Sequence, residues 1–333
     1  MRFLFFTDTH IRGTNPQNRK DNFYNTLQLK IREVFDIARQ NDVDIILHGG
    51  DIFDRPDISP SLVREFALLL NEYSFPIYAV AGNHDIYGQN PLTINRTMLG
   101  LLDGIGLIKI IGQDEKIYFQ DSKNRIKIQL TGQSYSYGID NEKKFDSYVI
   151  KKDAGVNFAI HMVHGMLLEK PFFEGAACTL MEEILDTEAD ITLAGHYHTG
   201  FDIKLIDGKY FLNPGSLARI NNSVAELSRK PKVYLVDIED KINIQEIVLM
   251  SALPGNEVLD RSKVEALAFK EKKLSEFVQS VYSAGSYSTI DISHIIEEVS
   301  KQQNVKEDVI REALSRIGDA QETLSSGNFS EVS

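Results

Sequence analysis

Five short stretches of the sequence carry side chains of the kinds that bind metal ions, and each stretch follows a run of apolar residues. They read Asp-Thr-His, Gly-Asp, Gly-Asn-His-Asp, His and Gly-His-Tyr-His. Imidazole nitrogens mixed with carboxylate oxygens suit manganese, iron or zinc, whereas an all-oxygen set would indicate magnesium or calcium. The candidate ligands are Asp8, His10, Asp51, Asn83, His84, His164, His196 and His198.

The number of candidate ligands indicates two metal ions rather than one. A single ion rarely takes more than about four protein ligands, whereas two neighbouring ions need about this many together with a shared carboxylate. Asp51, at the end of the middle of three predicted strands, is the expected bridge. Taken alone, an Asp-x-His pair is often a cap and a Gly-Asp pair a turn. Five such loops after five apolar runs favour the metal site.

The apolar pattern of the amino-terminal third predicts alternating strands and helices. This order would place the first three loops at one edge of a sheet. Ser59 is a candidate helix cap, and Pro60 suits the first turn of the helix that follows. Strands that alternate with helices are typical of an α/β sheet whose site lies beyond the carboxyl ends of the strands. The elements are expected at residues 2–6, 27–38, 43–47, 59–70 and 77–81.

After a helix expected at residues 92–102, the pattern changes to short alternating segments separated by polar turns. Such segments predict antiparallel strands, and hence a second sheet that begins near residue 107. The first three strands are expected at residues 107–111, 116–119 and 125–130. Later strands are expected at residues 156–160 and 191–194, with a strand and turn at 211–216 and a closing hairpin at 232–238 and 242–248.

Pro254-Gly255-Asn256 marks the expected end of the first domain, because the apolar spacing becomes helical beyond it. We expect a main domain over residues 1–252 and a small helical region over residues 257–325. This region would serve as a partner-binding or capping element. Its three helices are expected at residues 264–281, 292–299 and 309–317.

Composition describes a soluble globular chain of 333 residues with a net charge of −12. No apolar run is long enough to span a membrane, and the amino terminus does not read as a signal peptide. A single cysteine fits a reducing cytoplasm. The acidic balance argues against a broadly basic nucleic-acid surface without excluding nucleic acid, since bound metals add local positive charge. The candidate substrate contacts near the motifs are Arg12, Arg19, Arg55, Arg96 and Tyr197.

Together the five loops resemble those of the calcineurin-like metallophosphoesterases, and the resemblance covers about the first 250 residues. It implies a four-layer αββα sandwich of two packed mixed sheets flanked by helices. It also implies a hydroxide that bridges the two metals and attacks phosphorus. The implied ligands are Asp8, His10, Asp51 and His198 for one metal, and Asp51, Asn83, His164 and His196 for the other.

The same resemblance gives His84 a separate role. His84 would stay outside both metal shells and face the phosphate, where it could stabilise charge or protonate the leaving oxygen. Asp85 would orient the His84 ring. His48 and His161 are more simply interpreted as packed histidines or as supports for the ligands, and both interpretations stay open.

Within that superfamily the amino-terminal half is most similar to the bacterial SbcD-type DNA repair nuclease subunit. The similarity rests on Gly50-Asp51-Ile52-Phe53-Asp54 and on the Arg19-Lys20-Asp21 loop. It implies a two-metal DNA exonuclease or endonuclease, manganese as the metal, a homodimer, and a coiled-coil ATPase of SbcC type as partner. The Asn213-Pro214-Gly215-Ser216 turn is also found in small phosphodiesterases. A phosphodiesterase or phosphatase for a small nucleotide therefore stays open, as does a scaffold subunit with an unused site.

Overall fold

The computed structural model describes residues 1–121, 126–141, 145–171 and 176–284, together with positions 306, 308–309, 312 and 315–316. Its contacts divide the chain into two units, Met1–Arg261 and Ser262–Ser333. The first unit holds both large sheets and all of the candidate ligands. The second unit contains the helix α6 (Ser262–Ala284).

The first sheet has six strands, and the four at one side of it, from β1 to β4, run parallel. The carboxyl-terminal hairpin joins the edge of this group, since β13 pairs antiparallel with β1 and β14 pairs antiparallel with β13. In spatial order the strands are β14 (Ile242–Val248), β13 (Lys232–Ile238), β1 (Arg2–Phe6), β2 (Ile45–His48), β3 (Ile77–Ala79) and β4 (Lys109–Ile110).

The second sheet also has six strands, of which the four inner ones run parallel. Their order is β11 (Phe201–Ile206), β12 (Lys209–Asn213), β10 (Ile191–His196), β7 (Phe158–Gly165), β6 (Ile126–Gln133) and β5 (Lys116–Asp121). A small two-stranded sheet consists of β8 (Leu167–Leu168) and β9 (Thr179–Leu180).

The two sheets pack face to face, and β1 shows why its sequence is apolar throughout. Phe3 and Phe5 belong to the core shared with the second sheet, together with Leu130 and Met162. The alternate residue Leu4 belongs to the core beneath the helices. A strand that is buried on both faces reads as a continuous apolar run rather than an alternating one.

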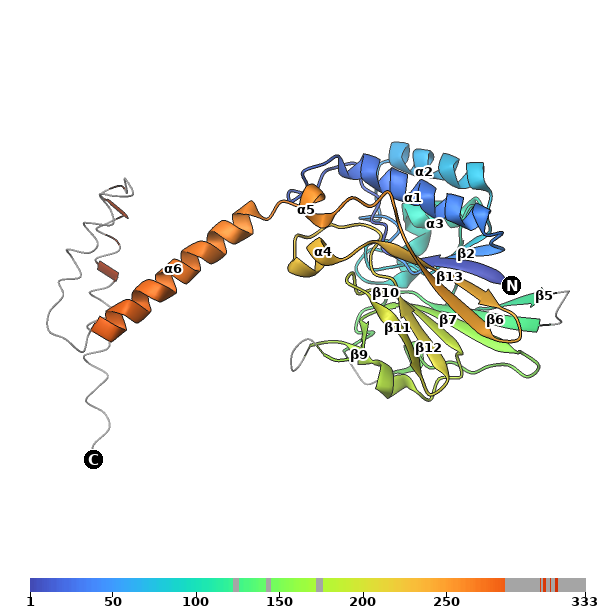
Figure 1. The fold of residues 1–333 in the computed structure, drawn as a ribbon. Coiled ribbons are helices and arrows are strands. Elements are labelled where there is room, and N and C mark those ends of the chain that lie inside the picture. The colour runs from blue at the N-terminus through green and yellow to red at the C-terminus, as the bar shows by residue number, and fades with distance from the viewer. Residues whose placement is uncertain are drawn as a thin grey trace, which may run out of the picture. The chain divides into compact units, whose positions relative to one another are not determined.

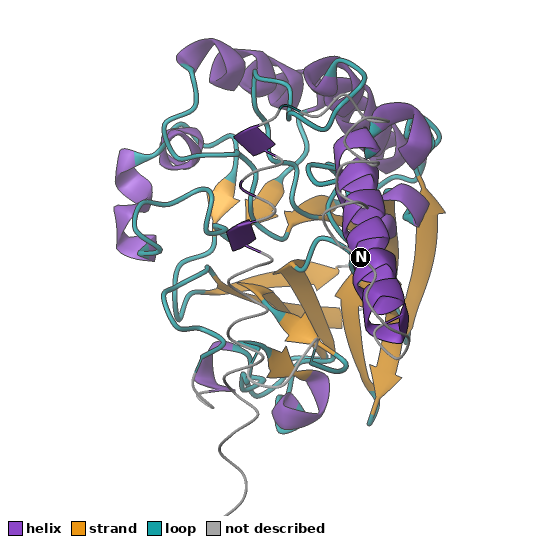
Figure 2. Cartoon of the chain, turned by 90° about the vertical axis from the view of Figure 1, so that its left-hand side faces the viewer, coloured by secondary structure: helices purple, strands orange, loops and turns teal. Residues whose placement is uncertain are grey.

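Helices cover the outer face of the first sheet (Figure 1), and Figure 2 shows them in purple beside the orange strands. They are α1 (Phe23–Gln40), α2 (Pro60–Tyr73) and α3 (Met98–Gly104). The outer side of the second sheet is covered by shorter pieces, the 3-10 helices η2 (Phe145–Ser147) and η3 (Met181–Ile184). The layer order is therefore that of the expected α/β metallophosphoesterase fold.

The helix starts show two ways of beginning a helix. Asn22 caps α1, because its side chain accepts a hydrogen bond from the backbone N–H of Asn25. Pro60 opens α2 as expected, but Ser59 makes no side-chain cap bond and its hydroxyl pairs with that of Ser61 instead. Ser59 is therefore the N-cap residue, as expected, but without the side-chain bond, and the fixed backbone of the proline suffices.

The helix expected at residues 92–102 is two helices, η1 (Pro91–Arg96) and α3. Thr97 interrupts it with extended backbone, and its side chain accepts from the N–H of Gly100 to start α3. The segment at residues 107–111 was also placed wrongly, since β4 pairs parallel with β3 in the first sheet. The sequence of a two-residue strand is too short to indicate which sheet the strand joins.

Two short helices, α4 (Val224–Ser228) and α5 (Gly255–Val258), complete the first unit. The expected helix at residues 292–299 lies outside the described residues, and only isolated positions of the one at 309–317 are described. Among the described helices, none is long and apolar enough to cross a bilayer.

Gly132 provides a test of the packing between the sheets. A Cβ atom at this position would lie 2.8 Å from both Val80 Cγ1 and Ile111 Cβ. Overpacking of this kind destabilises a core by roughly 1–3 kcal/mol. We therefore expect Gly132→Ala to lower the free energy of unfolding in urea by that amount.

The matched control is Gly104→Ala at the end of α3, where a Cβ atom would meet nothing within 4 Å. This variant should keep the wild-type unfolding midpoint or raise it slightly, because alanine is the better helix former by about 1 kcal/mol. Equal midpoints for the two variants would contradict the packing described here.

Candidate metal centre

Parallel pairing in both sheets brings the candidate loops to one edge. In the first sheet, β1, β2 and β3 lie side by side, with Phe6 opposite His48 and His48 opposite Ala79. The loops that follow these strands therefore start level with one another. In the second sheet, β7 and β10 are neighbours with His164 opposite Gly195. The carboxyl ends of five strands thus supply the candidate ligands.

The backbone at these strand ends is held in an uncommon conformation. Asp8, His10, Asp51 and His196 have φ angles of 53°, 44°, 53° and 76°. Each non-glycine residue in this region costs on the order of 1–3 kcal/mol, and such strain gathers at functional sites. Pairing between the loops maintains it, since Asp8 N–H donates to Gly50 O and His10 N–H to Asp51 O, both at 3.0 Å.

Two motif glycines are required by close approach rather than by the turn itself. A Cβ atom on Gly82 would lie 2.0 Å from Asp51 Oδ1, and one on Gly195 would lie 2.3 Å from Gly49 O. Any side chain at either position would push the loops apart. The glycines that precede Asn83 and His196 therefore allow the loops of different strands to meet.

The first cluster contains Asp8, His10, Asp51 and His198. His10 Nε2 lies 3.8 Å from Asp8 Oδ1 and 3.6 Å from Asp51 Oδ2. His198 Nε2 lies 3.4 Å from Asp8 Oδ1 and 3.1 Å from His10 Nε2. Two imidazoles and two carboxylates thus direct their ligand atoms at one point.

The second cluster contains Asp51, His164 and His196. His164 Nε2 lies 3.4 Å from Asp51 Oδ2, while its Nδ1 lies 2.7 Å from Gly49 O. A proton on Nδ1 donates to that carbonyl and leaves the Nε2 lone pair for a metal. Asp51 belongs to both clusters, as expected for a bridging carboxylate.

The polar atoms that face this gap fit a cation. The side-chain atoms Asp8 Oδ1, Asp51 Oδ2, Asn83 Oδ1 and His164 Nε2 are buried and have no hydrogen-bond partner. Buried polar atoms are otherwise nearly always paired. The second oxygen of each aspartate is held, because Asp8 Oδ2 accepts from Thr7 Oγ1 at 2.6 Å and Asp51 Oδ1 accepts from the N–H of His84 at 2.8 Å. One oxygen of each carboxylate is therefore fixed and the other is left for a metal.

Neighbouring imidazoles keep the buried carboxylates ionised. Burial would raise the pKa of Asp8 and Asp51, but hydrogen bonds and positive charge from the histidines hold both below the ordinary value. For His164, burial lowers the pKa, yet the charge of Asp51 outweighs it and raises the value to about 9. The site is thus built around negative charge that needs a cationic neighbour, and a divalent metal supplies one.

His84 and Asp85 do not contact each other in the way that was expected. His84 Nδ1 lies 2.9 Å from Asp54 O, so a backbone carbonyl orients this ring. Asp85 is fully buried, and its carboxylate accepts backbone N–H bonds from Gly82 at 2.9 Å and from the loop that carries Asp51. The expectation that Asp85 orients the His84 ring is therefore wrong. Asp85 instead ties the loop after β3 to the loop after β2.

Three of the expected substrate arginines have side chains at the surface. Arg12 forms an ion pair with Asp54 at 3.1 Å and is partly exposed. Arg55 is exposed beside Asp57, at 3.6 Å. Arg96 is exposed at the end of η1.

Arg19 was wrongly assigned as a substrate contact. Its side chain is only 3% exposed and donates to both carboxylate oxygens of Asp21 at 2.7 Å. A further bond joins it to Arg219 O at 3.0 Å. Arg19 therefore fixes the loop before α1, and its positive charge is paired with Asp21 inside the protein.

Tyr135 is a site residue that the sequence pattern did not reveal. Its ring centroid lies 5.3 Å from that of His196 and 6.2 Å from that of His164. It follows β6, whose carboxyl end reaches the same edge as that of β7. Its position just after a predicted strand is the one sequence feature that could have indicated a site residue. Tyr197 lies between two candidate ligands, and its backbone carbonyl accepts from Asn213 Nδ2 at 3.2 Å.

The two remaining described histidines are bonded inside the fold. His48 pairs with Thr9 Oγ1 and accepts from the N–H of Gly50, and burial lowers its pKa to about 3. His161 pairs with Thr131 Oγ1 at 2.9 Å and Ser147 O at 3.0 Å. Both ring nitrogens of each histidine are thus engaged by the protein.

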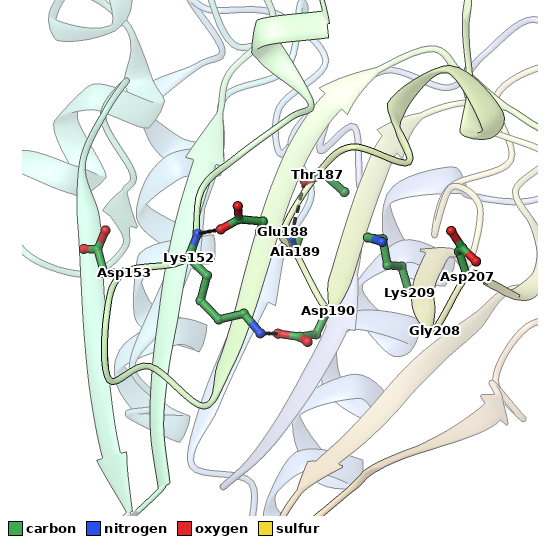
Figure 3. A pocket seen from close by; sticks show the side chains of 9 residues that line it. All are labelled: Lys152, Asp153, Thr187, Glu188, Ala189, Asp190, Asp207, Gly208 and Lys209. Atoms are coloured by element: carbon green, nitrogen blue, oxygen red, sulfur yellow. Dashed lines mark hydrogen bonds and ion pairs between the residues drawn. The ribbon is translucent and has the colours of Figure 1, made fainter.

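A polar pocket lies at the opposite end of the second sheet (Figure 3). It is lined by residues just before β10 and by the turn between β11 and β12. Lys152 and Asp190 form an ion pair of 2.7 Å across it, and Lys152 N–H donates to Glu188. Lys152 is thus already paired, and the pocket lies away from the carboxyl-terminal edge that carries the ligands.

Three known proteins to which this chain is similar illustrate the range of its relatives. The DNA double-strand break repair protein Mre11 of Thermoplasma acidophilum is 24% identical over 318 residues, which cover 90% of this chain and 81% of that protein. The double-strand break repair protein MRE11 of Encephalitozoon cuniculi is 23% identical over 330 residues, covering 86% of this chain but only 53% of its own length. A dimetal phosphatase of Danio rerio overlaps 74% of this chain and 96% of its own, with a TM-score of 0.47 at 11% identity.

The sequence pattern of the calcineurin-like phosphoesterases matches residues 1–200. That range is more than half of the chain, and it ends just beyond His198, so it includes every candidate ligand. The dimetal site of aspartates and histidines is thus a property of the matched region. We conclude that this chain belongs to the calcineurin-like phosphoesterase family.

Proposed function

We propose that this protein is a two-metal phosphodiester hydrolase that acts on DNA, as a nuclease of the SbcD and Mre11 type. The observation that carries the proposal is the pair of ligand clusters that share Asp51, with unpartnered ligand atoms facing one gap. The relatives named as DNA double-strand break repair proteins support DNA as the substrate.

Each cluster would hold one ion. Asp8, His10, Asp51 and His198 would bind the first ion, and the second would take Asp51 together with Asn83, His164 and His196. Mixed nitrogen and oxygen donors suit manganese, with iron and zinc as the other candidates. When bound, two such ions lower the pKa of water and neutralise the oxygens of a phosphoester.

His84 is the side chain that we assign to the substrate. Its Nδ1 is engaged by Asp54 O, and its ring packs edge-on against that of His10 at 4.8 Å. That arrangement fixes the ring beside the first cluster and leaves Nε2 to contact a phosphate or give a proton to the leaving oxygen. Arg12, Arg55 and Arg96 would position neighbouring phosphates.

The carboxyl-terminal helical region, residues 257–325, is proposed to bind a coiled-coil ATPase of SbcC type, and the main domain to form a homodimer in the cytoplasm. Helix-in-groove binding would suit a region of this kind. Cys178 is a free thiol, which fits a reducing compartment.

A phosphodiesterase for small nucleotides is the second candidate, favoured by the net charge of −12. A nuclease that relies on phosphate contacts usually carries a positive excess. The scaffold alternative is weaker, because each expected ligand position holds a side chain that can bind metal.

Cleavage assays distinguish the two enzymes. With manganese, the pure protein should cleave labelled single-stranded or double-stranded DNA and also bis-p-nitrophenyl phosphate. Hydrolysis of the small ester alone, with DNA untouched even after an SbcC-type ATPase is added, would reject the nuclease and leave the small-substrate enzyme.

Substitutions should separate metal binding from turnover. We expect Asp51→Asn to lose bound manganese, because the shared carboxylate loses its charge. His84→Ala should retain both ions and lose turnover by roughly 10²–10⁴-fold, the usual contribution of a positioned acid or base. Metal content by mass spectrometry and kcat on the small ester are the two measurements.

The control for Asp51→Asn is Asp57→Asn, which changes an exposed carboxylate beside Arg55. It should keep wild-type metal content. A His84→Ala variant with unchanged kcat would remove the role given to His84.

Metal removal should lower stability. With EDTA the buried carboxylates lose their cations, so we expect a lower Tm that manganese restores in a concentration-dependent manner. A ligand at 100 times its Kd stabilises the native state by about 2.7 kcal/mol. An unchanged Tm in EDTA and in millimolar manganese would show that the two clusters bind no ion.

A further inference from the structure

Two exposed tyrosines lie on loops that leave the metal edge of the sheets. Tyr137 is 81% exposed and Tyr87 is 40% exposed. Tyr87 follows the Gly82–Asp85 loop after β3, and Tyr137 follows β6. Large aromatic rings are usually buried for most of their area, so exposed ones beside a site indicate a contact surface.

Backbone hydrogen bonds hold these two loops together. Ala81 N–H donates to Ser134 Oγ, and Tyr135 N–H donates to Ala81 O, both at 2.9 Å. Further out, Tyr137 N–H donates to Gln89 O at 2.9 Å, two residues along the chain from Tyr87. The loop that carries Tyr137 therefore runs beside the loop that carries Tyr87.

Tyr135 connects these tyrosines to the metal centre. Its ring lies against the rings of His196 and His164, both of which belong to the second cluster. Two residues later, Tyr137 stands in solvent. We call Tyr87, Tyr135 and Tyr137 the tyrosine rim, since they extend from the ligands to the surface.

The loop of Tyr87 has a fixed shape. Tyr87 N–H donates to Thr93 Oγ1 at 2.9 Å, and that hydroxyl donates to Asn90 O at 2.7 Å. Gly88 and Gln89 both have positive φ, at 58° and 55°. Local bonds thus hold the backbone that carries the exposed ring, which lowers the entropy cost of ordering this loop when a ligand binds.

We propose that the tyrosine rim stacks an unpaired nucleobase of the strand whose phosphate lies at the metals. This inference rests on the proposed function, because it assumes a nucleic-acid substrate. A base is joined to its phosphate through one sugar, so the rim is in the right place for a nucleotide next to the bond that is cleaved.

Stacking also fits the charge of the protein. Aromatic side chains bind bases through a face that every base has, and this contribution is independent of sequence. A chain with a net charge of −12 gains little affinity from phosphate contacts, so stacking supplies affinity that the surface charge does not. The substrate should therefore have an unpaired base near the cleaved bond, as in a single strand or a frayed end.

The absence of tryptophan from the sequence gives a direct test. Tyr137→Trp introduces the sole tryptophan, and its fluorescence should be quenched by phosphorothioate oligothymidylate, which resists cleavage. An abasic strand of the same length should quench it much less. The matched control is Tyr118→Trp, a 42% exposed position on the edge strand β5, whose emission should not change.

Kinetics give the second readout. Wild-type enzyme should prefer a base-bearing single strand to an abasic strand in KM, and Tyr137→Ala should reduce that preference on the order of tenfold. Tyr118→Ala should keep the wild-type preference. Equal quenching by both strands, or an unchanged preference in Tyr137→Ala, would overturn the inference.

The outcomes remain distinct from those of the proposed function. If wild-type protein cleaves no DNA, the proposed function fails, and the quenching assay still tests the rim because it needs no cleavage. If DNA is cleaved and the rim variants behave as wild type, the nuclease stands and the stacking role is rejected. If the fluorescence of Tyr137→Trp falls with increasing protein concentration in the absence of DNA, a second copy of the protein covers the tyrosine rim. That result would also reject the stacking role.

Discussion

The structure depends on two buried carboxylates that keep their negative charge. Asp8 and Asp51 each have one oxygen held by a hydrogen bond and one without a partner. A buried charge is costly unless it is paired, and the surrounding histidines supply part of that pairing. A divalent cation would neutralise the rest of this buried charge. The backbone geometry of the strand ends directs the carboxylate oxygens toward the place where such a cation would bind. Backbone strain at Asp8, His10 and Asp51 places their side chains in the gap.

The two-sheet core explains how that strain is supported. Phe3 and Phe5 from one sheet pack with Leu130 and Met162 from the other, so the carboxyl-terminal edges of both sheets are fixed next to each other. Pairing between loops then continues past the strands, and buried Asp85 ties the loop after β3 to the loop after β2. Hydrogen bonds and packing within the protein thus tie the ligand loops to one another, as precise ligand geometry requires.

Beyond the metals, two of the arginines near the motifs are already engaged by carboxylates. Arg19 is buried against Asp21 and Arg12 is paired with Asp54, which leaves Arg55 and Arg96 as the more exposed candidates for phosphate contacts. Exposed aromatic rings at the same edge offer the other general way of holding a nucleotide. The stacking proposal therefore builds on the nuclease proposal, and each has its own test.

Local patterns of composition and period specify the ligand types, their glycine spacers and the strands that precede them, so these features could be predicted from the sequence. The αββα fold followed from the resemblance and is confirmed by the family match. Only the tertiary structure decided which sheet residues 107–111 join, that Asp85 binds backbone N–H groups, that Arg19 is buried and that Tyr135 lies on two histidines. Those outcomes depend on partners far away in the sequence, and a local pattern carries no record of them.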